Sequence, residues 1–285
     1  MPPQNLQTLF SAKGFKSKSE FTAFVLTALE ERYQPTSASL DSDIYFVDIP
    51  QGWGKRVFFA VVHRWEYGNL RKTRNSVAQT LRFRMPSPTH NCAQSWLAHC
   101  LLAWQFAGDL YLEEVASLNV VAGNRLELSR SLYSNSLKEP DVSLYPDGYD
   151  LRPPNAFEVS WSETADGLDA NELDADAELL LRESNPAIRV VVNIKWCIDS
   201  SSRTVRGTLS AWRLDPYETP YMTQHEVIFP APQPPRPQYL ELSLTDIFSS
   251  AVAPGRDPLD ALRLDIGLLR RKATFSFNAM NLIPA

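Results

Sequence analysis

The sequence is poor in cysteine, with three in 285 residues: Cys92, Cys100 and Cys197. Three cysteines cannot form the set of paired disulfides that holds small secreted domains together. They fit a reducing compartment instead. We therefore expect an intracellular protein of the cytoplasm or the nucleus.

Long apolar runs are also missing. The longest, VFFAVV (57–62) and IRVVVNI (188–194), are much shorter than the roughly 20 residues of a membrane-spanning helix. The start MPPQNLQTLF lacks the basic-then-apolar pattern of a signal peptide. We expect no association with a membrane.

Several motifs of well-known enzyme classes are absent. The chain has no GxSxG elbow for a serine hydrolase, and neither a GxGxxG nor a P-loop for a nucleotide. A cluster of His90, Cys92, His99 and Cys100 invites a zinc site. However, seven residues along a helix advance about 10 Å, which is too far for Cys92 and His99 to share one ion. Core packing is the better interpretation.

Charge is unevenly distributed along the chain. The net charge is −5, yet residues 1–90 hold 12 Lys and Arg against 7 Asp and Glu, whereas residues 91–285 hold 16 against 26. A basic N-terminal third can attract a polyanion such as nucleic acid. The candidate contacts are Arg71, Lys72, Arg74, Arg82 and Arg84. The alternative is two ordinary solvated surfaces.

Apolar periodicity predicts the elements of the N-terminal third. Residues 18–33 have helical spacing, and Pro35 closes that segment. Residues 43–49 and 55–65 resemble two strands of a hairpin joined by PQGWG. Residues 79–85 alternate apolar with basic residues, which predicts a strand with Arg82 and Arg84 on one face.

The centre of the chain is predicted to alternate between helices and strands. A buried helix over 93–106 precedes three short strands at 125–129, 141–145 and 155–161, an acidic helix over 163–183, and a strand at 188–196. The unbroken β-branched run of 188–196 is typical of a central strand that lies parallel to its neighbour. Strands at 205–214 and 225–229 and a helix at 260–273 follow.

Two carboxylates occupy strand positions that rarely suit them. In an antiparallel register with Tyr145 opposite Pro154, Asp141 lies opposite Glu158. Carboxylates on Cβ atoms about 5 Å apart repel each other unless they share a proton or a cation. Oxygen ligands suit Mg²⁺, for which Mn²⁺ can substitute, and this pairing suits metal-assisted phosphodiester hydrolysis.

These residues resemble a known family. Glu139-Pro140-Asp141, followed by Glu158-Val159-Ser160 within the order helix, three strands, helix, strand, resembles the PD-(D/E)xK (restriction-endonuclease-like) nuclease superfamily, and most closely its fungal members. The resemblance covers about residues 90–215. It implies that Asp141 and Glu158 are metal ligands and catalytic residues, with Glu139 as an accessory acid.

The sequence departs from the family at its lysine. The family's lysine lies two residues after the second acid, where this chain has Ser160, and a hydroxyl cannot supply that positive charge. If strand 188–196 runs parallel beside 155–161 with an offset of 35 residues, Lys195 lies beside Ser160 and can replace the lysine. Lys138 is a weaker candidate, because it is expected in a turn.

The sequence therefore predicts an α+β fold. Residues 90–215 would form a nuclease-like core with a four-stranded mixed sheet between helices. Residues 1–89 would add a helix and a hairpin, and residues 216–285 would add strands and a helix. The predicted function is a Mg²⁺-dependent nuclease acting on nucleic acid, with DNA preferred over RNA. The oligomeric state is left open.

Simpler interpretations stay open for both acids. Asp141 can simply end a turn, and Glu158 can be a half-exposed strand residue paired with Arg152. The missing lysine also allows a second function, in which a nuclease-like fold has lost catalysis and serves as a nucleic-acid or protein binding module.

Overall fold

The computed structural model describes residues 7–32, 42–85, 87–128, 133, 135–148, 153–162, 168–184 and 188–285. The chain has an α+β fold and divides into two compact units. The N-terminal unit comprises Met1–Ser87 and Arg125–Glu139, and the C-terminal unit comprises Pro88–Asn124 and Pro140–Ala285. Residues 125–139, which the sequence analysis assigned to the core, thus belong to the N-terminal unit.

A six-stranded sheet forms the N-terminal unit. Its strands follow the order β1-β2-β4-β3-β7-β6, and only β1 and β2 run parallel among these pairs. Their bounds are β1 Gln7–Ser11, β2 Ser42–Val47, β3 Arg71–Asn75, β4 Thr80–Met85, β6 Leu126–Leu128 and β7 Ser136–Lys138. Helices α1 (Lys18–Arg32) and α2 (Trp53–Val62) share one hydrophobic core with the sheet.

Helix α2 corrects the prediction of a strand at 55–65. The run VFFAVV fits a strand or a buried helix equally well by composition. In the structure, Val57, Phe58 and Val61 are buried at the i, i+1, i+4 spacing of one helical face. Gly52 begins the helix with a φ of 83°, a left-handed conformation that glycine adopts without strain.

A buried charge cluster connects β2 and β4. The carboxylate of Asp43 accepts hydrogen bonds from Nη2 of Arg82 at 2.7 Å and from Nε of Arg84 at 3.1 Å. The three residues are 8%, 8% and 5% exposed. Arg82 also lies over the ring of Tyr45. The two arginines share a face of β4, as their alternation predicted, but they are bound to an acid within the protein.

A five-stranded sheet organises the C-terminal unit. Its order is β12-β11-β10-β9, with β15 added parallel to β11. The bounds are β9 Asn155–Ser162, β10 Val190–Asp199, β11 Thr204–Leu214, β12 Pro220–Phe229 and β15 Ile283–Pro284. Two smaller ladders pair β5 (Leu118–Val121) with β8 (Ser143–Pro146), and β13 (Tyr239–Ser243) with β14 (Ala261–Asp265). The helices are α3 Pro88–Ala107, α4 Leu112–Ala116, α5 Leu168–Glu183, α6 Leu244–Phe248 and α7 Ile266–Ala279.

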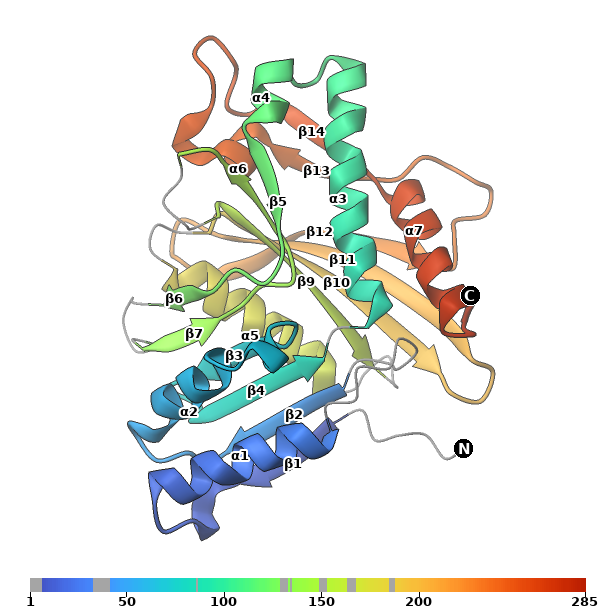
Figure 1. Ribbon diagram of the computed structural model, residues 1–285. Coiled ribbons are helices and arrows are strands. Elements are labelled where there is room, and N and C mark those ends of the chain that lie inside the picture. Colours follow the sequence, from blue (N-terminus) through green and yellow to red (C-terminus); the bar gives the residue numbers. More distant parts are fainter. Residues whose placement is uncertain are drawn as a thin grey trace. The chain divides into compact units, whose positions relative to one another are not determined.

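Helices cover both faces of this sheet (Figure 1). On one face, Trp96 of α3 packs against Phe157, and Phe277 of α7 packs against Trp161 and Trp196. Helix α5 packs along β9 and β10 on the other face (Figure 1). Strand β10 is therefore buried on both sides, as its β-branched run predicted.

Two further expectations about elements need correction, and one strand was not predicted. The predicted strand 125–129 exists as β6, but it pairs with β7 in the N-terminal unit. The first strand of the C-terminal unit is β5, which the sequence analysis missed. The predicted helix 260–273 begins as strand β14, because Leu262 and Leu264 alternate with exposed Arg263. Residues 163–167 of the predicted acidic helix lie outside the described residues.

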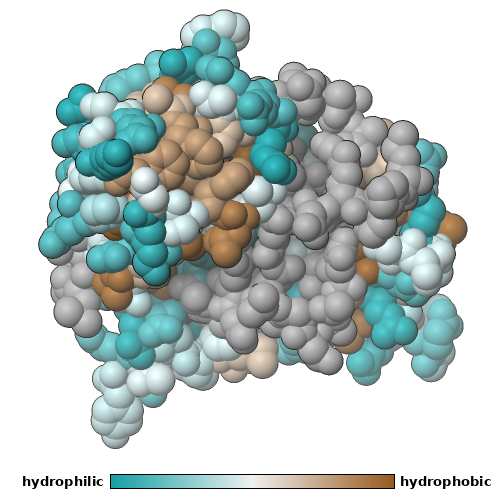
Figure 2. All heavy atoms as spheres, turned by 90° about the horizontal axis from the view of Figure 1, so that it is seen from below, coloured by the Kyte–Doolittle hydropathy of each residue, from teal (hydrophilic) through white to brown (hydrophobic). Residues whose placement is uncertain are grey.

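None of the helices in the described ranges is long and apolar enough to cross a bilayer. On the face drawn in Figure 2, a patch of hydrophobic residues lies among hydrophilic ones. Large hydrophobic side chains exposed in the N-terminal unit are Leu9, Trp65 and Val77.

Removing Asp43 tests the buried charge cluster. Asp43→Ala takes away a carboxylate that two buried guanidinium groups share, so the free energy of unfolding should fall by about 3–5 kcal/mol. Glu30→Ala removes the exposed partner of Arg64 in the same unit and should cost at most about 1 kcal/mol. Urea unfolding followed by circular dichroism measures both. Equal losses in the two variants would contradict the assignment.

Candidate active site

A single backbone bridge sets the geometry of the candidate site. Val142 and Phe157 form an antiparallel pair. The N···O distance is 3.2 Å for the hydrogen bond that Val142 donates and 2.8 Å for the one that Phe157 donates. In this register Asp141 lies opposite Glu158, which is the register that the sequence analysis expected. The bridge is short, because the carboxamide of Asn155 bonds the N–H and C=O of Leu144 in place of backbone pairing.

Asp141 continues the ladder with its side chain. Its Oδ2 accepts a hydrogen bond of 2.8 Å from the backbone N–H of Val159, which a paired strand would otherwise satisfy. Its Oδ1 lies 3.5 Å from Nε2 of His90 in the first turn of α3. The carboxylate is therefore part of the strand edge as well as a candidate ligand.

Glu158 shares one face of the sheet with three other polar residues. The parallel register of β9 and β10 sets Asn193 beside Glu158 and Lys195 beside Ser160. Alternate residues of a strand point to the same side, so these four side chains share the face that Phe157 and Val159 do not occupy. The offset of 35 residues between Ser160 and Lys195 is the one that the sequence analysis expected.

The site is well enclosed. Asp141 is 4% exposed, Glu158 is 1% exposed, and Lys195 is half-buried. The idea that Glu158 is a half-exposed strand residue is therefore wrong, and its suggested partner Arg152 lies outside the described residues. The Oγ of Ser160 is buried and makes no hydrogen bond to a described residue.

Lys138 and Glu139 belong to the N-terminal unit. Lys138 is buried in strand β7, where it pairs with Thr73, so its expected place in a turn is wrong. Glu139 accepts a hydrogen bond of 3.2 Å from the backbone N–H of Lys72, and its Oε2 lies 3.4 Å from Nζ of Lys72. Burial raises the pKa of Glu139 and lowers the pKa of Lys72. This accessory acid therefore has a lysine partner of its own.

The basic residues proposed for nucleic acid are mostly buried. Lys72 and Arg74 are 4% and 8% exposed, and Arg82 and Arg84 are bound to Asp43. Only Arg71 in this set is half-buried. Four of the five candidate contacts are therefore buried inside the N-terminal unit.

Within the described ranges, no group of three or more His, Cys, Asp or Glu side chains is arranged to hold a metal ion. Cys92 and Cys100 are buried in α3, as the core-packing interpretation expected. Burial raises the pKa of the Cys100 thiol to about 12, and it also raises that of Cys92. Burial thus favours the neutral form of both thiols.

Sequence reasoning missed two residues at this site. His90 was treated only as part of a cysteine and histidine cluster, yet it lies beside Asp141. Asn193 was seen as part of an apolar run, yet it lies beside Glu158. A polar residue two positions before Lys195 in an otherwise apolar strand was the available signal.

Comparison of the chain with protein-family models, with curated proteins and with solved structures finds no match. The resemblance to PD-(D/E)xK nucleases thus stays a prediction from the sequence.

The structural contribution of Asp141 can be separated from its charge. Asp141→Ala leaves the buried N–H of Val159 without its acceptor and should lower the free energy of unfolding by about 1–3 kcal/mol. Asp141→Asn keeps a carbonyl acceptor and relieves repulsion with Glu158, so its stability should equal or slightly exceed that of the wild type. Asp147→Ala, at an exposed position nearby, serves as the control. Equal destabilisation by Ala and Asn would refute this account.

Proposed function

We propose that the protein is a metal-dependent nuclease that hydrolyses phosphodiester bonds of nucleic acid, with Asp141, Glu158 and Lys195 as its catalytic residues. The observation that carries the proposal is the register of the Val142–Phe157 bridge, in which Asp141 is opposite Glu158. Two opposed, buried carboxylates are costly unless a proton or a cation offsets their repulsion.

The order of elements in the C-terminal unit supports the proposal. Without the short helix α4 and the segment 125–139, the unit runs α3, β5, β8, β9, α5, β10. Strands β5 and β8 are antiparallel. Val142, directly before β8, forms the antiparallel bridge to Phe157 of β9, and β10 is parallel to β9. The order helix, three strands, helix, strand is the one expected for a restriction-endonuclease-like core.

Each residue has a distinct task in this proposal. The donor set at Asp141 and Glu158 is made of carboxylate oxygens, which fits Mg²⁺ or Mn²⁺. When bound, the ion supplies Lewis-acid activation of water and of the phosphate. Lys195 reaches the same face from β10 and offsets negative charge that develops on the phosphate. Asn193, beside Glu158, helps to orient that carboxylate.

Burial favours a second function. Because Asp141 and Glu158 are at most 4% exposed, a substrate phosphate has little access to them in this conformation. A chain of this fold that has lost catalysis would act as a binding module for nucleic acid or protein. The two functions differ in whether the carboxylates bind a divalent ion.

Metal binding decides between them. Calorimetry should detect Mg²⁺ binding to the wild type, and Asp141→Asn should abolish it, because one charge and one oxygen ligand are lost. Asp147→Asn removes an exposed acid outside the site and should leave the affinity unchanged. If the wild type binds a nucleic-acid duplex without any metal dependence, the binding module is correct and the nuclease is not.

Lys195 can be tested by moving its charge. Lys195→Ala should reduce the cleavage rate at least about 100-fold with metal affinity retained, as loss of one preorganised electrostatic group does. The double variant Ser160→Lys, Lys195→Ala returns the charge to the neighbouring strand position and should recover part of the rate. Lys272→Ala, on α7, is a control. A fully active Lys195→Ala protein would assign the role elsewhere.

A further inference from the structure

A separate pocket lies within the N-terminal unit. It has a volume of about 420 Å³ and is lined by residues from the start of α2, from β3 and β4, and by Asn135 before β7. Two of its twelve lining residues, Lys55 and Arg74, are cationic, and none of the twelve is acidic. Its neutral polar lining residues are Gln51, Asn75, Ser76, Gln79, Thr80 and Asn135.

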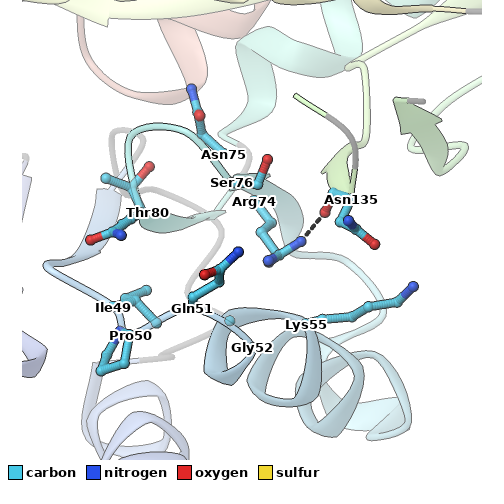
Figure 3. A pocket seen from close by; sticks show the side chains of 12 residues that line it. Ile49, Pro50, Gln51, Gly52, Lys55, Arg74, Asn75, Ser76, Thr80 and Asn135 are labelled. Atoms are coloured by element: carbon cyan, nitrogen blue, oxygen red, sulfur yellow. Dashed lines mark hydrogen bonds between the residues drawn. The ribbon is translucent and has the colours of Figure 1, made fainter. Parts of the chain in front are cut away.

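Arg74 presents a buried charge to this pocket. The residue is 8% exposed, and its Nη1 donates a hydrogen bond to the backbone oxygen of Asn135 (Figure 3). No carboxylate among the described residues pairs with it, in contrast to Arg82 and Arg84, and burial lowers its pKa. A buried guanidinium without a counterion is costly, so the site is favourable for an anion.

The start of α2 adds to this positive charge. A Cβ built on Gly54 would lie 2.8 Å from Nε of Arg74, so the guanidinium packs directly on the first helical turn (Figure 3). That turn has no side-chain cap, and its N–H groups form the positive end of the helix dipole. A cation at this end is unfavourable by itself. An anion in the pocket that contacts both the guanidinium and the helix start is attracted by both.

The charge of the pocket indicates which anion binds. Arg74 and Lys55 with the helix terminus supply more than two positive charges, and a phosphate monoester carries about −1.5 to −2 at neutral pH. A phosphodiester carries a single charge and has two terminal oxygens, whereas a monoester has three to share among the three groups. The pocket volume also lies in the range of small-molecule sites.

We propose that this pocket binds the terminal phosphate of a phosphate monoester, held by Arg74, Lys55 and the N-terminal amides of α2. This site does not depend on the proposed nuclease function, because its residues all belong to the N-terminal unit. A free phosphorylated small molecule and a phosphorylated nucleic-acid end offer the same chemistry. The experiment distinguishes these two sources.

Calorimetry on the full chain, in a buffer without phosphate, tests the site with four probes. Inorganic phosphate and phenyl phosphate should bind, and dimethyl phosphate should bind at least about 10-fold more weakly, because it has one charge. A 5′-phosphorylated oligonucleotide is compared with the same oligonucleotide ending in a hydroxyl. Tighter binding of the phosphorylated strand than of phenyl phosphate identifies a nucleic-acid end, and the reverse identifies a small molecule.

Three variants identify the binding residues. Arg74→Gln should weaken phosphate binding at least about 10-fold, yet leave the melting temperature of the unliganded protein equal or higher, because a buried charge is removed. Lys55→Ala should weaken binding several-fold, whereas Arg56→Ala, the adjacent exposed cation outside the pocket, should not. Asp141→Asn should bind phosphate like the wild type.

Two results would overturn the proposal. One is the absence of phosphate or phenyl phosphate binding to the wild type at about 10 mM, a concentration at which even a millimolar site is mostly filled. The other is affinity that does not change in either Arg74→Gln or Lys55→Ala. If Arg74→Gln proves unstable, Lys55→Ala against Arg56→Ala still decides the outcome, since both side chains are exposed.

Discussion

The backbone bridge between Val142 and Phe157 fixes the alignment on which the candidate active site depends. A shift of one residue would turn Asp141 or Glu158 to the opposite side of the strand. Side chains reinforce the bridge at both ends, since Asn155 bonds the backbone of Leu144 and Asp141 bonds that of Val159. The carboxylate of Asp141 thus stabilises the strand edge, and the register sets this residue opposite Glu158.

Buried cations of the N-terminal unit differ in the partners that they have. Arg82 and Arg84 share the carboxylate of Asp43, and Lys72 pairs with Glu139. Among the described residues, Arg74 has the backbone carbonyl of Asn135 as its partner and no carboxylate. Arg74 thus differs from Arg82, Arg84 and Lys72, and the uncapped start of α2 lies beside it. This contrast distinguishes the cation of the pocket from the other three.

Local sequence predicted some elements well and failed on others for identifiable reasons. Helices α1 and α3 and strands β9 and β10 were expected, because their apolar patterns are long and unambiguous. Helix α2 was mistaken for a strand, since VFFAVV suits either state until its packing partners are known. Strand β14 was mistaken for the first part of the helix predicted at 260–273, because its two leucines alternate over only five residues.

The sequence by itself determined the α+β class, the opposition of Asp141 and Glu158, and the pairing of Lys195 with Ser160. These follow from the alternation of apolar and polar residues along each strand, because burying the apolar face fixes the register with the neighbouring strand. Only the tertiary structure decided that residues 125–139 complete the N-terminal sheet, that Arg82 and Arg84 bind Asp43, and that Arg74 lies against the start of α2. Each of these depends on contacts between residues far apart in the sequence. Arg74, for example, lies 20 positions from Gly54 and 61 positions from Asn135. Periodicity within one segment carries no information about such partners.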